Sequence, residues 1–136
     1  MSRENVEVVR RIYEAVARQD ADAVLDLYHP EVTWDFSRSP FASVLTRTAY
    51  RGPDGLRSFT RERHEAWRDV ADELEELVDA GDAVVSVVRT RGHGRRSGAE
   101  AALRHAGAWT IEDGRVVQVV WFPSRREALE AVGLRE

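Results

Sequence analysis

The stretch WTIEDGRVV, residues 109–117, decides the fold class of this sequence. An Asp-Gly pair between two apolar runs is the strongest short-range signal of a β-hairpin, and Asp113-Gly114 stands in that position. The runs on its two sides, residues 101–111 and 116–122, are predicted strands, and Pro123 ends the second of them. A sheet of antiparallel strands is therefore expected to organise the C-terminal half.

Outward from this hairpin, two more strands are predicted toward the N-terminus, over residues 74–78 and 83–91. Residues 80–82 form the turn between them, and the Gly-rich stretch 92–98 joins the second strand to the hairpin. After the last strand, Ser124 caps a short helix. Four strands in series predict an antiparallel meander followed by one helix.

The N-terminal half has the spacing of helices. Apolar residues recur at i, i+3 and i+4 over residues 6–16, which predicts an amphipathic helix. Asp20 caps a second, short helix that ends at Pro30. A short strand over residues 32–36 is expected to follow.

Residues 37–51 have no clean period and are expected to form a loop. Gly52-Pro53-Asp54 then opens a third helix, with Leu56, Phe59, Arg63 and Trp67 along it. Helices first, then a meander and a last helix indicate an α+β fold. No linker or repeat interrupts the chain, so residues 1–136 are expected to form a single domain.

Composition narrows the classes of function. The 136 residues carry 24 acidic and 20 basic side chains, for a net charge of −4, and every base is Arg. An acidic chain without a basic run is a poor nucleic-acid binder. The chain has no cysteine and its four histidines lack ligand spacing, so we expect no metal and no cofactor. No stretch approaches the ~20 apolar residues of a membrane span, and the polar start predicts a cytoplasmic location.

Five stretches carry a resemblance to a known family through their order and spacing. They are VRRIY (9–13), YHPEVTW (28–34), YRGPDGL (50–56), WTIEDGRVV (109–117) and REALEAVGL (126–134). Together they resemble the NTF2-like superfamily, and its SnoaL-like, ketosteroid isomerase-related branch in particular. The resemblance implies a cone-shaped roll, with N-terminal helices packed on a curved mixed or antiparallel sheet. It also implies an apolar pocket for a small molecule in the cone and a homodimer through the outer sheet face.

Three positions that carry catalytic side chains in the family's isomerases and cyclases hold other residues here. By this resemblance, Ile12 replaces the oxyanion-hole tyrosine, Phe36 replaces the aspartate base and Gly107 replaces the strand acid. Tyr13 is one residue from the first position, but one residue is about 100° round a helix. The chain is therefore expected to lack the usual isomerase and cyclase sets, and whether it is an enzyme stays open.

Asp35, between Trp34 and Phe36, is the carboxylate nearest to the family's base position. Side chains alternate along a strand, so Val32, Trp34 and Phe36 share the apolar face and Asp35 points away from it. We therefore expect Asp35 outside the pocket, although a one-residue bulge would reverse this.

Two other polar side chains are candidates for catalysis in the cone. His105 shares a strand face with Trp109, and histidine acts as an acid or a base near neutral pH. Arg89 shares a face with Val85 and Val87, which we expect to be the inner one. An arginine there would favour a carboxylate, phosphate or enolate. For both residues a purely structural role stays open.

Aromatic side chains are expected to form the walls of the pocket. The residues expected to bind a ligand are Tyr13, Trp34, Phe36, Phe59, His64, Trp109 and Trp121. Other strand positions are too apolar for solvent and are expected to form the dimer interface. They are Val84, Ser86, Val88, Thr90, Val116, Gln118, Val120 and Phe122.

Three functions fit these expectations. The chain is an isomerase-, cyclase- or hydrolase-type enzyme acting on a small molecule, a non-catalytic module that holds a small ligand, or a dimeric scaffold. An enclosed pocket with two or more converging polar groups favours the enzyme. An apolar pocket favours the binding module, and a filled cone favours the scaffold.

Overall fold

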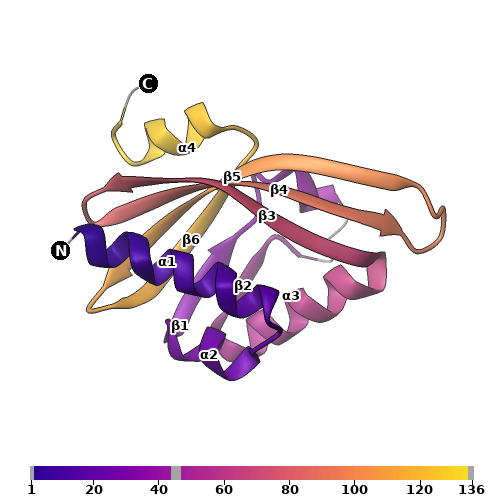
Figure 1. The fold of residues 1–136 in the computed structure, drawn as a ribbon, viewed down its shortest axis with the longest axis horizontal. Coiled ribbons are helices and arrows are strands. Elements are labelled where there is room, and N and C mark those ends of the chain that lie inside the picture. Colours follow the sequence, from indigo (N-terminus) through magenta and orange to yellow (C-terminus); the bar gives the residue numbers. More distant parts are fainter. Residues whose placement is uncertain (1, 44–46, 135–136) are drawn as a thin grey trace.

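The computed structural model describes residues 2–43 and 47–134, whose arrangement is shown in Figure 1. The helices are α1 (Ser2–Ala17), α2 (Ala21–Asp26), the 3-10 helix η1 (Pro40–Ser43), α3 (Gly52–Ala66) and α4 (Arg125–Ala131). The strands are β1 (Tyr28–Asp35), β2 (Ala49–Arg51), β3 (Trp67–Ala80), β4 (Ala83–Gly94), β5 (Glu100–Glu112) and β6 (Arg115–Phe122). The predicted α+β class is confirmed.

The strands form one six-stranded sheet in the order β2-β1-β6-β5-β4-β3. β1 runs parallel to β6 and the other neighbours are antiparallel, so the sheet is mixed. The predicted hairpin joins β5 to β6, where Glu112 pairs with Arg115. Asp113 and Gly114 at its tip have φ angles of 51° and 79°. Positive φ at both central residues is the geometry of a type I′ turn, which Asp-Gly favours.

Helices cover both faces of the curved sheet (Figure 1). α1, α2 and α3 lie on one face, called the inner face below, and α4 lies on the other, the outer face. The inner core contains Val9, Trp109 and Val119, whereas the outer core joins Phe122 to Leu129 of α4. The N-terminal helices thus close the inner face into a cone.

Two predicted helix caps are present. The Asp20 carboxylate accepts a hydrogen bond from the Ala23 N–H at 3.2 Å, and the Ser124 hydroxyl accepts one from the Glu127 N–H at 3.2 Å. Each satisfies a backbone donor that the first helical turn leaves without a partner. α1 begins at Ser2 and buries one apolar side, which includes Ile12.

The boundaries of β3 differ most from prediction. The strand was expected over residues 74–78, but it runs from Trp67 to Ala80, and α3 ends at Ala66. Trp67 is therefore a strand residue and not a helical one. Asp69 has a φ of 54°, and the pairing with β4 is irregular at two places, which obscures the two-residue period of the sequence. β2 and η1 also lie within the segment predicted as a loop.

The face assignment along β4 was wrong. Val88 and Thr90 face the helices, so the Arg89 side chain lies on the outer face, where it is exposed. The sequence concealed this because residues 84–88 are all buried, with α1 on one face and α4 on the other. A strand covered on both faces shows no alternation of apolar and polar residues.

The same reversal removes several residues from the predicted dimer face. Val84, Ser86, Val88 and Thr90 lie on the inner face, and an irregularity between β5 and β6 turns Val116 into the inner core as well. Phe122 is on the outer face, but α4 packs against it.

Candidate functional site

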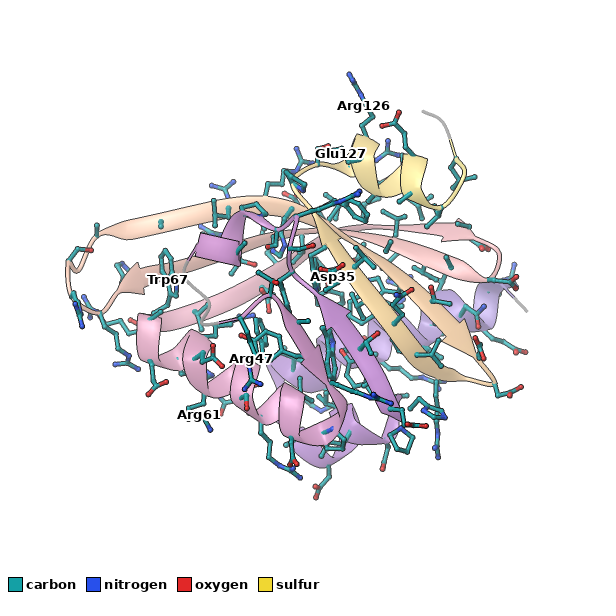
Figure 2. All side chains as sticks on the ribbon, turned by 180° about the vertical axis from the view of Figure 1, so that it is seen from behind. Asp35, Arg47, Arg61, Trp67, Arg126 and Glu127 are labelled. Atoms are coloured by element: carbon teal, nitrogen blue, oxygen red, sulfur yellow. The ribbon has the colours of Figure 1, made fainter. Side chains whose placement is uncertain are left out.

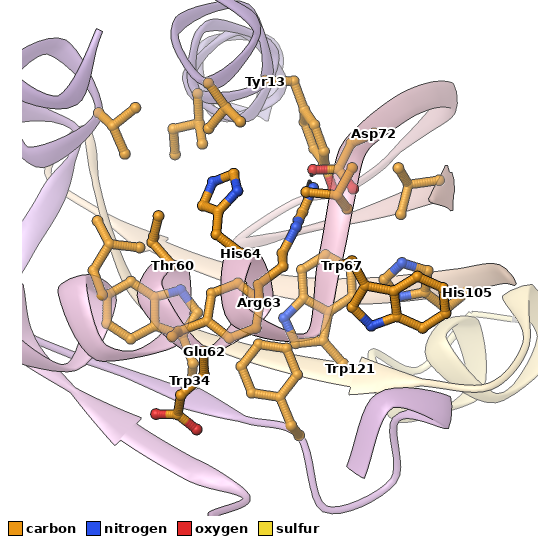
Figure 3. Close-up of a pocket in the computed structure, with 18 of the residues that line it drawn as sticks. Tyr13, Trp34, Thr60, Glu62, Arg63, His64, Trp67, Asp72, His105 and Trp121 are labelled. Carbon is orange, nitrogen blue, oxygen red and sulfur yellow. Dashed lines mark ion pairs between the residues drawn. The ribbon is translucent and has the colours of Figure 1, made fainter. Parts of the chain in front are cut away.

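A cavity of about 210 Å³ lies between α1, α3 and the inner face of the sheet (Figure 3). Its walls are rich in aromatic side chains and include all four tryptophans of the chain, Trp34, Trp67, Trp109 and Trp121. The volume is below the roughly 300–1,000 Å³ of most ligand pockets. An engineered cavity of about 150 Å³ accepts benzene. The space therefore suits a molecule of about one ring.

The cavity opens between the end of α1 and the end of α3. Val16, Gln19 and His64 line it and are exposed, and Val16 keeps 42% of its surface accessible. The tip of the β4–β5 hairpin lies beside this mouth. The backbone N–H of Arg95 donates to the Ala66 carbonyl at 3.1 Å, and its side chain donates to the His64 carbonyl. The hairpin tip thus holds the end of α3 in place.

All seven residues expected to bind a ligand line the cavity. They are Tyr13, Trp34, Phe36, Phe59, His64, Trp109 and Trp121. Three of them stack: the Phe36 ring lies 4.7 Å from the Phe59 ring and 6.1 Å from the Trp121 ring. Their position agrees with the expectation, and their role in binding stays a prediction.

A chain of polar groups runs along one wall of the cavity. Arg63 of α3 pairs with Asp72 of β3, with 3.0 Å between a terminal nitrogen of Arg63 and Oδ2 of Asp72. The Thr90 hydroxyl of β4 donates to Oδ1 of Asp72 at 2.7 Å. Nε2 of His105, on β5, lies 3.0 Å from the same hydroxyl oxygen. Figure 3 shows Arg63 reaching across the cavity toward Asp72.

These hydrogen bonds determine which ring nitrogen of His105 carries the proton. Thr90 has one hydroxyl proton, which it donates to Asp72, so Nε2 of His105 must donate to the Thr90 oxygen. The other ring nitrogen, Nδ1, then carries a lone pair in the neutral ring. Burial lowers the pKa of His105 to about 4, and the imidazole is therefore neutral at pH 7.

A second polar contact ties α1 to the sheet. The Ser86 hydroxyl oxygen accepts a hydrogen bond from the Trp109 indole N–H at 2.8 Å, and it lies 3.1 Å from the Tyr13 hydroxyl. Burial raises the pKa of Tyr13 far above its ordinary value, so this phenol is neutral at all working pH values. The Tyr13 and Trp109 rings also meet edge to face at 5.8 Å.

Gly107, where the resemblance led us to expect the replaced strand acid, has no room for a side chain. A Cβ atom at Gly107 would lie 2.9 Å from the Trp121 ring and 3.0 Å from the indole nitrogen of Trp109. Ile12 and Phe36, at the other two positions, are apolar residues of the cavity wall. Two carboxylates line the described part of the cavity, Asp72 from β3 and Glu62 from α3.

The remaining two candidates lie outside the cavity. Asp35 of β1, labelled in Figure 2, accepts a hydrogen bond from the Ser37 backbone N–H at 2.8 Å, and it does not line the cavity as its neighbours Trp34 and Phe36 do. Arg89 was expected to enter the cone, and that expectation is wrong, because the residue is on the outer face.

Sequence reasoning missed Asp72, and with it the partners Arg63 and Thr90. The signal existed: Val70, Asp72 and Leu74 alternate with exposed residues along β3. Extending the predicted strand toward the N-terminus by this period would have placed Asp72 on the same face as two apolar residues.

No described helix has the length and apolar character needed to cross a membrane. Within residues 2–43 and 47–134, no three His, Asp or Glu side chains gather as a metal ion would need.

The model of the SnoaL-like domain family matches residues 9–119. An NTF2-like protein from Burkholderia thailandensis E264 is 28% identical, with 87% of this chain and 88% of that chain covered and a TM-score of 0.76. An NTF2-like protein of unknown function from Burkholderia pseudomallei K96243 is 24% identical over 96% and 98% of the two chains, with a TM-score of 0.77. TerC, co-crystallised with polyporic acid, is 20% identical over 95% and 98%, with a TM-score of 0.78. Comparison with curated proteins gives no match.

Proposed function

Because the chain belongs to the SnoaL-like domain family, we propose that it is an enzyme that binds a small conjugated molecule in its cone and moves a proton on it. The observation that carries the proposal is the chain Arg63–Asp72–Thr90–His105 on the wall of an aromatic cavity. Converging, hydrogen-bonded ionisable groups in a pocket are the usual sign of acid–base chemistry.

Asp72 is the proposed base. It is a carboxylate on the cavity wall with 14% of its side chain accessible. Glu62 also lines the cavity, but it accepts a hydrogen bond from the Tyr50 hydroxyl at 2.9 Å, and Figure 3 shows it turned away from Arg63 and Asp72. In the proposed step, a C–H proton beside a carbonyl passes to Asp72 and the electron pair moves onto the carbonyl oxygen. The proton then returns to another atom of the conjugated system.

His105 serves this step as a positioning residue. Its Nε2–H holds the Thr90 oxygen, and Thr90 holds Asp72, so the carboxylate has one fixed orientation. Because the imidazole is neutral, it adds no charge that would compete with Arg63 for the carboxylate.

The aromatic walls favour a flat, conjugated ligand, which stacks on indole and phenyl rings. The co-crystallisation of TerC with polyporic acid supports an organic ligand for a protein of this fold. At about 210 Å³, however, the empty cavity here accepts only a small one.

Deuterium exchange tests the proposal without knowledge of the natural substrate. The chain is incubated in D₂O with a panel of small aromatic ketones, and loss of the α-proton signal is followed by NMR. We expect exchange above the protein-free rate, and its loss in Asp72→Asn. Asp35→Asn is the matched control, since Asp35 is a carboxylate outside the cavity. Exchange that survives Asp72→Asn would refute Asp72 as the base.

A non-catalytic binding module is the second candidate. Ile12, Phe36 and Gly107 favour it, because they carry no acid or base at the positions where the resemblance expects the family's catalytic side chains. Asp72 also favours it, because one of its oxygens pairs with Arg63 and the other accepts from Thr90. Ligand binding without any proton exchange in the same experiment would select it. A cavity that binds nothing would select the scaffold.

The homodimer and the cytoplasmic location remain predictions. The outer-face strip not covered by α4 carries the ion pairs Arg91–Glu73 and Arg104–Glu75, both at 2.8 Å or less. A dimer interface there would therefore be polar. Light scattering at two salt concentrations would measure the oligomeric state and its sensitivity to screening.

A further inference from the structure

The guanidinium of Arg63 has more N–H donors than partners among the described residues. Among the described residues it forms an ion pair with Asp72 through one terminal nitrogen, although the group carries five N–H donors. Its side chain keeps 20% of its surface accessible and lines the cavity. The edge of the guanidinium that does not face Asp72 therefore presents N–H donors to whatever fills the cavity.

The carboxylates around Arg63 are already occupied. Asp72 forms an ion pair with Arg63 through one oxygen and accepts a hydrogen bond from Thr90 at the other. Glu62 accepts from Tyr50 on the far side of α3, and burial together with this bond raises the pKa of Tyr50 to about 12. Of the two described wall carboxylates, Asp72 therefore already has partners at both oxygens, and Glu62 is turned toward Tyr50.

Two indole groups also carry N–H donors without a partner among the described residues. Nε1 of Trp67 and Nε1 of Trp121 are buried and have no hydrogen-bond partner within the described part of the chain. Both rings line the cavity. A buried donor without a partner costs about 1–3 kcal/mol. The cavity wall therefore offers indole N–H donors in addition to the guanidinium of Arg63.

We propose that the ligand carries a negatively charged oxygen on an aromatic ring, a carboxylate or a phenolate, which binds the open edge of Arg63. This inference rests on the proposed function, because it names the class of molecule that enters the same cavity. A planar carboxylate accepts two parallel N–H donors from a guanidinium, which fixes the ring in one orientation. The aromatic body of the ligand then lies among the tryptophans.

Three probes of one ring separate the contributions: benzoate, its neutral isostere benzamide, and toluene. All four tryptophans line the cavity, so quenching of their fluorescence reports its occupation. We expect benzoate to bind wild-type protein at least tenfold more tightly than benzamide. Arg63→Gln should weaken benzoate at least tenfold and leave toluene within twofold. Arg61→Gln is the matched control, because Arg61 is exposed on the same helix and points away from the cavity (Figure 2).

If Arg63→Gln alone does not fold, the double variant Arg63→Gln with Asp72→Asn replaces it in the experiment. The second substitution removes the negative charge of Asp72, which Arg63→Gln leaves without a partner. The double variant should show the same loss of benzoate binding. Equal affinity of wild type for benzoate and benzamide would overturn the inference, as would benzoate affinity that does not depend on Arg63. If toluene binds and benzoate does not, the cavity binds small molecules, but the inference that its ligand is an anion is wrong. If none of the three binds, the proposed binding function fails, and the inference fails with it.

Discussion

The Trp121 ring fills the space that a side chain at Gly107 would need, because a Cβ atom on Gly107 would lie 2.9 Å from Cζ3 of that ring. The indole nitrogen of Trp109 closes the same space from the other side, at 3.0 Å. Trp109 and Trp121 meet edge to face with their centroids 5.8 Å apart, so they form one rigid wall. The aromatic wall and an acidic side chain at position 107 are therefore mutually exclusive in this cone.

Gly107→Ala should destabilise the fold by about 1–3 kcal/mol, the usual range for a methyl group forced into a packed core. Urea unfolding measures the change. In a Trp121→Phe background the same substitution should cost less, by about 0.5 kcal/mol or more, because the six-membered part of the indole is gone. Equal costs in the two backgrounds would show that Trp121 does not limit the space at position 107.

The order of the elements was predictable because local chemistry determines it. Asp113-Gly114 specifies the turn, Asp20 and Ser124 cap their helices, and the period of residues 6–16 specifies α1. The irregular parts were not predictable in this way. β3 begins at a residue that continues the helical pattern of α3, and its pairing is interrupted at Asp69.

A pH titration of stability tests the environment of His105. Its folded-state pKa is lowered to about 4, chiefly by burial, so between about pH 6.5 and 4 the unfolded chain binds a proton that the folded chain does not. Stability should thus fall as the pH falls through this window, by about 3 kcal/mol from this group alone. His105→Gln should flatten the profile, which urea unfolding at several pH values measures. An NMR titration of His105 with a midpoint near 6.5 would contradict the prediction.

The candidate site was predictable only where one face of a strand is apolar. His105 and Trp109 line the cavity as expected, because they share one face of β5 while the small residues Ala106 and Ala108 lie on the other. Arg89 was not, because both faces of β4 are covered and the hydropathy of residues 84–88 is uniform. The period of β3 could have placed Asp72 on the inner face, but its ion pair with Arg63 joins two elements, and no local pattern reveals that pair.

The Arg63–Asp72 pair should contribute to stability, since both side chains are mostly buried, at 20% and 14% exposure. Asp72→Asn leaves a partly buried guanidinium without its counter-charge, and a loss of about 2 kcal/mol is expected, at the lower end because both groups retain some water. Arg63→Gln added to Asp72→Asn should cost little more. Asp54→Asn is the control, because its pair with Arg57 is exposed and should be worth less than about 1 kcal/mol. Strictly additive losses in the double variant would mean that the two charges do not interact.

Ser86→Ala should weaken the packing of α1 on the sheet. The loss of stability should be larger than expected for the removal of one hydroxyl group. The hydroxyl is fully buried and receives the Trp109 indole N–H at 2.8 Å while it contacts the Tyr13 hydroxyl at 3.1 Å. Removing it leaves the indole N–H and the phenol without this partner in a place closed to water, at about 1–3 kcal/mol for each unsatisfied group. Tyr13→Phe should cost less, because Ser86 still accepts from Trp109. Both losses are read from urea unfolding, and hydrogen exchange in α1 shows whether the opening is local. A Ser86→Ala protein as stable as Tyr13→Phe would mean that another group accepts the Trp109 N–H.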